Sequence, residues 1–315
     1  MTTAPRFEPS DESDLWPEDE PDITPEFQRE TYLGRAKSGY TKVRHTFVQT
    51  PPAAKRGSTP STLAAFGRNH RAAVLYLAVL ANWPWLSREA EPLPSGSWIR
   101  FLQCEAEGSL TWTPQSLSHA WKTLEDLGLV LRPRKGRLLA IEPRREDGKA
   151  AYTPPDGANG DSYWVLPNEF WTQELHGTLS WPGLAVLLVL LKETNGRRTA
   201  ELAIDRAKAY YGLGRTTVEA GLTELRKLGI VDSRDRFVRD ADTGDGRRRT
   251  SVHMPLGPFS MEARAALRGA AADRMAKRSA KKAGPKTKSA LKPRKPRAKR
   301  RGGGEDENAL AEPVA

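Results

Sequence analysis

The stretch TPQSLSHAWKTLEDLGLVLRPRKGR, residues 113–137, decides the fold that we expect. Thr113 can cap a helix that opens with Pro114, and apolar side chains then recur at helical spacing. These side chains are Leu117, Trp121, Leu124 and Leu127. Gly128 ends the helix, and a short apolar run leads into a basic turn that reverses the chain into a second strand. The stretch therefore predicts a helix followed by a small β-hairpin.

A second copy of this pattern lies in GRTTVEAGLTELRKLGIV, residues 214–231. Its segment LRKLGIV matches LEDLGLV of the first copy at an offset of 101 residues. The apolar segments AVLYLAVLANW (73–83) and AVLLVLLKETN (185–195) match at an offset of 112. The first copy therefore has about eleven more residues between its helices, and the sequence predicts two related modules.

These patterns predict a mainly α-helical protein with small β-hairpins, an α+β fold. We expect the first module at residues 61–145 and the second at residues 162–258. Residues 146–161 are polar and contain Gly, Pro and Asp, which is typical of a linker between domains.

Several elements can be placed within this frame. An apolar helix should run from residue 69 to 83 and stop before Pro84, because proline interrupts helical hydrogen bonding. The alternation at residues 40–48 favours a strand or an extended arm. The helix predicted at residues 216–228 should bury one stripe, formed by Val218, Leu222, Leu225 and Leu228.

The two ends of the chain have a different composition from the modules. Residues 1–30 hold ten acidic side chains against two arginines, and we expect residues 1–60 to form a disordered acidic terminus and a linker arm. Residues 259–315 should form a largely disordered basic tail that ends in acidic residues, with a helix possible after Ser260.

Composition excludes several classes of function. The net charge of +11 favours a polyanionic partner. A single cysteine excludes an internal disulfide, the five histidines are scattered, and we expect no metal or cofactor. Phosphate-loop and nucleophile-elbow motifs are absent, so we do not expect an enzyme. The longest apolar run, residues 181–191, is too short to cross a bilayer, which predicts a soluble, cytoplasmic protein.

The polar faces of the two repeated helices are candidates for contacting bases in a DNA major groove. Gln suits adenine, Lys and Arg suit guanine, Glu can accept from cytosine, and Thr can contact the thymine methyl group. The candidates in the first helix are Gln115, Ser116, Ser118, His119 and Lys122. Those in the second helix are Arg215, Thr216, Thr217, Glu219 and Thr223.

Basic residues outside these helices are candidates for contacting phosphates, which position a protein without specifying sequence. In the hairpins they are Arg134, Lys135, Arg137, Arg247, Arg248 and Arg249. In the tail they are Lys292, Arg294, Lys295, Arg297, Lys299, Arg300 and Arg301, which should bind any DNA.

Helix, strand, basic turn and strand, present twice, resemble the winged helix-turn-helix superfamily over residues 65–142 and 163–256. The segment YWVLPNEFW that opens the second copy is also similar to the lead-in of helix-turn-helix modules in plasmid and phage replication proteins. Tandem winged helices are similar to plasmid replication initiators, which bind repeated origin sequences. The resemblance implies double-stranded DNA as the partner, together with replication or transcription machinery.

Three roles stay open at this point. The chain can be a plasmid or mobile-element replication initiator whose modules bind adjacent half-sites, with directly repeated target sequence. It can instead be a transcriptional regulator that binds promoter DNA. A third role is that of an architectural or partitioning protein that coats DNA through its tail. The sequence leaves the oligomeric state open.

Overall fold

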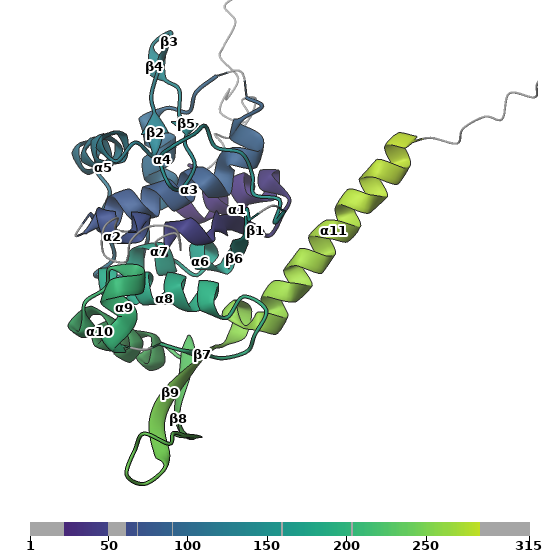
Figure 1. Ribbon diagram of the computed structural model, residues 1–315. Coiled ribbons are helices and arrows are strands. Elements are labelled where there is room, and N and C mark those ends of the chain that lie inside the picture. Colours follow the sequence, from purple (N-terminus) through teal and green to yellow (C-terminus); the bar gives the residue numbers. More distant parts are fainter. Residues whose placement is uncertain are drawn as a thin grey trace, which may run out of the picture. The chain divides into compact units, whose positions relative to one another are not determined.

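The computed structural model describes residues 22–49, 61–67, 69–89, 91–158, 160–202 and 204–283. The described residues up to Arg274 form one compact unit, and those from Met275 onward belong to a second one. The described chain is about half helical with small antiparallel sheets (Figure 1), so the expected mixed α+β class is confirmed. The compact unit is described below.

The first half of this unit contains five helices, a short 3-10 helix and five strands among its described residues. In chain order they are α1 (Pro25–Ala36), β1 (Tyr40–Arg44), η2 (His45–Phe47), α2 (Thr62–Phe66), α3 (His70–Leu86), α4 (Ser95–Leu102), α5 (Pro114–Asp126), β2 (Val130–Leu131), β3 (Arg134–Lys135), β4 (Leu138–Leu139) and β5 (Glu142–Pro143). β3 pairs with β4 and β2 pairs with β5, which forms the expected hairpin.

The second half follows a similar order. Its elements are β6 (Tyr163–Pro167), α6 (Glu169–Thr172), α7 (Leu175–Thr178), α8 (Trp181–Glu193), β7 (Ala200–Glu201), α9 (Ile204–Tyr211), α10 (Arg215–Lys227), β8 (Val231–Arg239), β9 (Arg247–Pro255), η3 (Gly257–Phe259) and α11 (Met261–Ala283). β8, β9 and β7 form one antiparallel sheet with β9 in the centre.

Local sequence explains why the repeated helices begin where they do. The Thr113 side chain accepts a hydrogen bond from the Ser116 backbone N–H, and Ser116 returns the contact as a capping box. The Ser180 side chain likewise accepts from the Gly183 N–H at the start of α8. After α5, Gly128 adopts the left-handed φ of 67° that ends the helix.

The two apolar helices α3 and α8 form the centre of one continuous hydrophobic core. α5 packs on α3 and α10 packs on α8, so each half places its second repeated helix on its own core helix. Leu117, Trp121 and Leu124 are buried on α5, and Val218, Leu222 and Leu225 are buried on α10. Leu228, the residue that follows the end of α10 at Lys227, is 51% exposed, so its assignment to the core was wrong.

β1 and β6 join the two halves. They pair antiparallel over five residues each, from Tyr40 opposite Pro167 to Arg44 opposite Tyr163. The strand expected near residues 40–48 is therefore present, but its partner lies more than a hundred residues away. β1 packs on α3 and β6 packs on α8, so the small sheet ties both core helices together.

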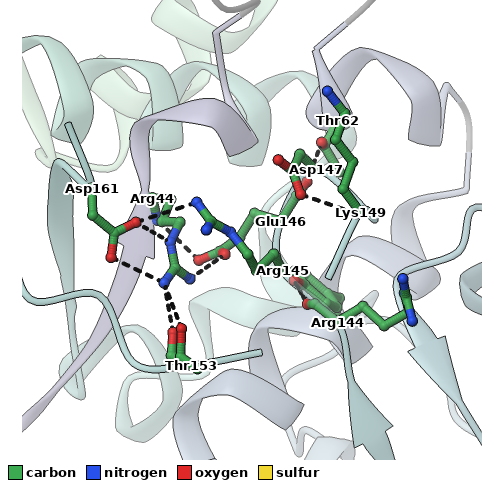
Figure 2. Close-up of polar contacts among 10 residues, drawn as sticks. Arg44, Thr62, Arg144, Arg145, Glu146, Asp147, Lys149, Thr153 and Asp161 are labelled. Carbon is green, nitrogen blue, oxygen red and sulfur yellow. Dashed lines mark hydrogen bonds and ion pairs between the residues drawn. The ribbon is translucent and has the colours of Figure 1, made fainter. Parts of the chain in front are cut away.

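A buried ion cluster ties the segment after β5 to β1 (Figure 2). The Arg44 guanidinium donates to Glu146 Oε2 at 2.8 Å, to Asp161 Oδ1 at 2.5 Å and to the Thr153 carbonyl at 2.6 Å. Hydrogen bonding to Arg44 lowers the pKa of Asp161. Residues 146–161 were expected to form a linker because they are polar. Three of them, Glu146, Thr153 and Asp161, instead accept hydrogen bonds from the buried Arg44 inside the fold.

Two further expectations were wrong. Residues 22–30 were expected to be disordered, yet Thr24 caps α1, and Arg29 is buried with its guanidinium 2.6 Å from Glu174 Oε1. The contacts of the buried Arg29 thus outweigh the acidic composition of this segment. α3 continues through Pro84 to Leu86, because the buried Trp85 ring, whose Nε1 donates to Asn82, holds the last turn in place.

α11 begins as expected after Ser260, whose hydroxyl accepts from the Ala263 N–H. Within the compact unit, Arg264 is buried and donates to the Leu191 carbonyl at 2.7 Å and to the Thr194 carbonyl at 3.0 Å. These carbonyls belong to the end of α8, where a cation is favoured by the helix dipole. The expectations for residues 1–21 and for the tail arginines and lysines at 292–301 lie outside the described residues.

Candidate nucleic-acid interface

The outer face of α5 carries the side chains expected to contact DNA. Gln115, Ser118, His119 and Lys122 are exposed, and the Lys122 side chain is 72% accessible. Lys122 Nζ lies 3.2 Å from Asp126 Oδ1 one turn further along the helix. Such an exposed pair is weak and can exchange its carboxylate for another acceptor. Four of the five predicted residues of this helix are therefore placed where a ligand can meet them.

Ser116 is the exception on α5. Its hydroxyl accepts from the Thr113 backbone N–H at 2.9 Å and donates to the Thr113 carbonyl at 3.1 Å. The side chain is half-buried. The capping role accounts for this serine without any contact to a base.

A hollow of about 420 Å³ lies between the outer face of α5 and the first turn of α3. Asn69, His70 and Arg71 line it from α3, opposite Gln115 and His119. Burial, and then the neighbouring Arg71, lower the pKa of His70 to about 4, so its ring is neutral at pH 7. These three residues were not among the predicted ones, because the spacing of the apolar positions does not tell which end of α3 contacts α5.

The outer face of α10 is arranged in the same way. Arg215, Thr216, Glu219 and Thr223 are exposed, and Thr217 is half-buried. Arg215 Nε donates to Glu219 Oε1 at 2.9 Å, and the Thr223 hydroxyl donates to the Glu219 carbonyl at 2.8 Å. An open, shallow surface runs along this face. Its lining comes from α10 itself and consists of Thr216, Glu219, Ala220, Thr223, Glu224 and Lys227.

The hairpin formed by β2 to β5 is strongly basic. Residues 130–143 contain four Lys/Arg against one acid, Glu142. Arg134, Lys135 and Arg137 are exposed at its tip, where Gly136 makes the turn with a φ of 62°. The expected cluster of cations is therefore present at one end of a β-hairpin.

The hairpin formed by β8 and β9 is less basic than its arginines suggest. Residues 231–255 contain six arginines against five aspartates. Arg249 Nε donates to Asp235 Oδ2 at 3.0 Å, and Arg248 Nε donates to Asp240 Oδ2 at 3.1 Å. Hydrogen bonds from Ser251 and then from Arg249 lower the pKa of Asp235. Arg247 to Arg249 are exposed, as expected, but two of them already have carboxylate partners on the same hairpin.

Metal-ligating side chains do not cluster in the part of the chain that the structure describes. Those residues contain no group of three or more His, Cys, Asp or Glu side chains that could hold a metal ion. None of the described helices combines the length and the apolar character that a membrane span requires. Comparisons of the chain with protein-family models, with curated proteins and with solved structures find no match.

Proposed function

We propose that this chain is a sequence-specific double-stranded DNA-binding protein that uses two winged helix-turn-helix modules. α5 and α10 are its recognition helices, and the hairpins β3–β4 and β8–β9 are its wings. The observation that carries the proposal is the pair of outer faces on α5 and α10. Each helix buries its apolar stripe on its own core helix and leaves a row of side chains exposed that can donate to or accept from base edges.

The order of elements supports the same proposal. The second module runs helix α8, strand β7, helices α9 and α10, then the hairpin β8–β9, with β7 added to the hairpin as a third strand. A short strand between the first two helices that joins the wing is typical of winged helices. The first module has α3, α4, α5 and a hairpin in the same order.

The role that we propose for this binding is the initiation of replication on a plasmid or mobile element. A single chain that carries two recognition helices is suited to mark one long DNA site, as an origin requires. A regulator of transcription has the same needs at a promoter, and the location of the sites separates the two roles. Fragments bound from the total DNA of the source organism should contain clustered repeats beside an origin, whereas promoter-centred fragments would favour the regulator.

Base contact by the recognition helices is tested with a site selected from random duplex DNA by the full chain. Lys122→Ala and Arg215→Ala should each weaken binding to this site by about 1–3 kcal/mol, roughly 5-fold to 150-fold, and leave binding to scrambled DNA nearly unchanged. Arg88→Ala is the matched control, because Arg88 is exposed just beyond the end of α3 that is opposite to Asn69. It should change neither affinity.

Two results would contradict the proposal. If the selection yields no preferred site, sequence-specific binding is excluded, and the third role, nonspecific coating through the tail, takes its place. If the recognition-helix variants lose affinity for selected and scrambled DNA equally, these side chains contact phosphates only and do not specify bases.

A further inference from the structure

Several contacts are those expected of two modules related by an approximate two-fold axis, and the first of them is the β1–β6 pair. Each strand precedes the helices of one module, and each is followed by a short helix, η2 or α6. They run antiparallel with Lys42 opposite Val165 at the centre, so that Tyr40 and Tyr163 occupy equivalent ends. Two equivalent strands that pair in this way are exchanged by a half-turn, whereas modules related by a simple shift would keep the strands parallel.

The core helices agree with this relation. His70 begins α3 and Trp181 begins α8, and their rings lie 6.0 Å apart between centroids in an edge-to-face arrangement. The two helices therefore meet at the same end, as a half-turn requires.

The short helices before the core helices exchange equivalent contacts. α2 leads into α3 and packs against the turn before α10, where the Ser61 hydroxyl donates to the Tyr211 carbonyl at 3.0 Å. α7 leads into α8 and packs against the turn before α5, where the Leu110 N–H donates to the Gly177 carbonyl at 2.9 Å. Each module thus supports the segment that leads to the recognition helix of the other module.

Close approach of the backbone repeats in the same two places. A Cβ added to Gly177 would lie 3.3 Å from the Cβ of Cys104, and one added to Gly212 would lie 3.6 Å from the Cα of Ala64. In both cases the added Cβ would lie even closer to a side-chain atom of the same neighbour, Cys104 Sγ or Ala64 Cβ. A glycine is therefore needed on one side of both contacts, which fixes the modules against each other.

Within the compact unit, the half-turn sets the order of the DNA-facing elements. Figure 1 shows α5 and α10 on the same side of the unit, with the hairpin β3–β4 beyond α5 and the hairpin β8–β9 beyond α10, in opposite directions. The order along this side is wing, recognition helix, recognition helix, wing. Modules in the same orientation would give wing, helix, wing, helix.

We propose that one copy of this chain binds a single DNA site whose two half-sites lie in opposite orientation. This inference rests on the proposed DNA-binding function and adds the form of the ligand. The symmetry of a DNA-binding protein is mirrored in the symmetry of its site, so a half-turn between recognition helices requires inverted half-sites. Direct repeats of target sequence, where they occur, are then repeats of the whole site, each occupied by one chain.

The half-sites are inverted in geometry but different in sequence. At the offset of 101 residues, Gln115, Ser118, His119 and Lys122 of α5 correspond to Thr216, Glu219, Ala220 and Thr223 of α10. In none of these pairs do the two side chains carry the same hydrogen-bonding groups. A search for a palindrome in the selected sequence would therefore miss the inverted arrangement of the half-sites. The test must instead map where each wing and each recognition helix lies on the DNA.

The test places a DNA-cleaving iron chelate on one introduced cysteine at a time in the full chain. Arg137→Cys and Asp242→Cys put the probe on the two wings, and Ser118→Cys and Glu219→Cys put it on equivalent positions of the two recognition helices. The unsubstituted chain is the control, because its single cysteine, Cys104, is only 5% exposed and burial raises the pKa of its thiol to about 12. Cleavage is mapped on the selected site at saturating protein, and the number of chains per duplex is measured by native mass spectrometry.

The expected pattern has the two wing probes cutting at opposite outer ends of the site and the two helix probes cutting between them, with one chain per duplex. Cuts in the order wing, helix, wing, helix would overturn the inverted arrangement, and so would two chains on the shortest duplex that retains full affinity. In both cases sequence-specific binding would still stand. Failure of the selection itself would instead remove the proposed function on which the inference rests.

Discussion

Gly221 allows α10 to cross α8 closely, and replacing it with alanine tests the packing on which the second recognition helix depends. A Cβ at this position would lie 2.6 Å from Val186 Cγ2 and 2.8 Å from the carbonyl carbon of Pro182, and nearer still to the Pro182 carbonyl oxygen. Carbon atoms in contact prefer about 3.5–4.0 Å, so the two helices must separate by roughly 1 Å. The obstacle is largely backbone, which cannot rotate away as a side chain can.

Overpacking of this kind costs about 1–3 kcal/mol. The gain in helix propensity from Gly to Ala works in the opposite direction, and Gly269→Ala measures it separately. Gly269 is exposed in the middle of α11, and an added Cβ there meets nothing within 4 Å. We expect Gly269→Ala to raise the free energy of unfolding by about 0.5–1 kcal/mol. The free energy of unfolding of the Gly221→Ala variant should then be about 1–3 kcal/mol lower than that of the Gly269→Ala variant.

Thermal unfolding followed by circular dichroism gives the comparison. At about 2–4 °C per kcal/mol for a unit of this size, the melting temperatures of the two variants should differ by roughly 2–12 °C. The displaced α10 should also weaken binding to the half of the selected site that it contacts. Equal melting temperatures for the two variants would refute the close crossing of α8 and α10.

Three other predictions follow from the ion pairs and the buried groups. Asp235→Asn removes the carboxylate that holds Arg249, so affinity for DNA of any sequence should rise about twofold to fivefold in a titration at low salt, with a smaller rise at high salt. Burial lowers the pKa of His176 to about 4, whereas the unfolded chain binds this proton near pH 6.5. The stability from this group is complete above pH 6.5 and is lost as the pH falls towards 4, so that His176 alone should contribute a loss of about 2 kcal/mol between pH 7 and pH 5, and His176→Gln should reduce the loss measured in urea unfolding by about that amount. Glu146→Leu should cost roughly 3 kcal/mol because it strips a buried partner from Arg44, and the double change with Arg44→Met should recover much of that loss; a double variant less stable than the single one would contradict this.

Sequence signals predicted a structural feature well where the residues that form the signal lie within about one helical turn of that feature. The cap Thr113 and the turn at Gly128 were predicted in this way, since a cap depends only on the next three residues. The exposed faces of α5 and α10 followed from the buried stripes. The failure at Leu228 shows the limit, because a stripe does not tell where the helix ends.

Contacts between distant segments could not be predicted. Arg29 and Glu146 lie in segments whose composition is typical of a disordered terminus and of a linker. Their burial depends on Glu174 and Arg44, which are 145 and 102 residues away in the sequence. The pairing of β1 with β6 is equally remote, and with it the half-turn between the modules. Repetition in the sequence showed that the modules are related, but a repeat is the same whether its copies are shifted or rotated in space.

The acidic side chains on the proposed interface suggest how such a protein discriminates between DNA sequences. A surface that only attracted phosphates would need cations alone, yet Lys122 is paired with Asp126 and Arg215 with Glu219. Near DNA, each carboxylate is repelled by the phosphates unless it finds a donor, and in the major groove Glu219 can find one only where an amino group of cytosine or adenine faces it. On a DNA sequence without such an amino group, Arg215 must leave Glu219 to contact the DNA, and the carboxylate of Glu219 is left without a donor. The cost to the binding free energy is therefore larger at a wrong site than at the correct one. Specificity would then come from carboxylates on the recognition helices, and general affinity from Arg134, Lys135 and Arg137 at the tip of the wing β3–β4.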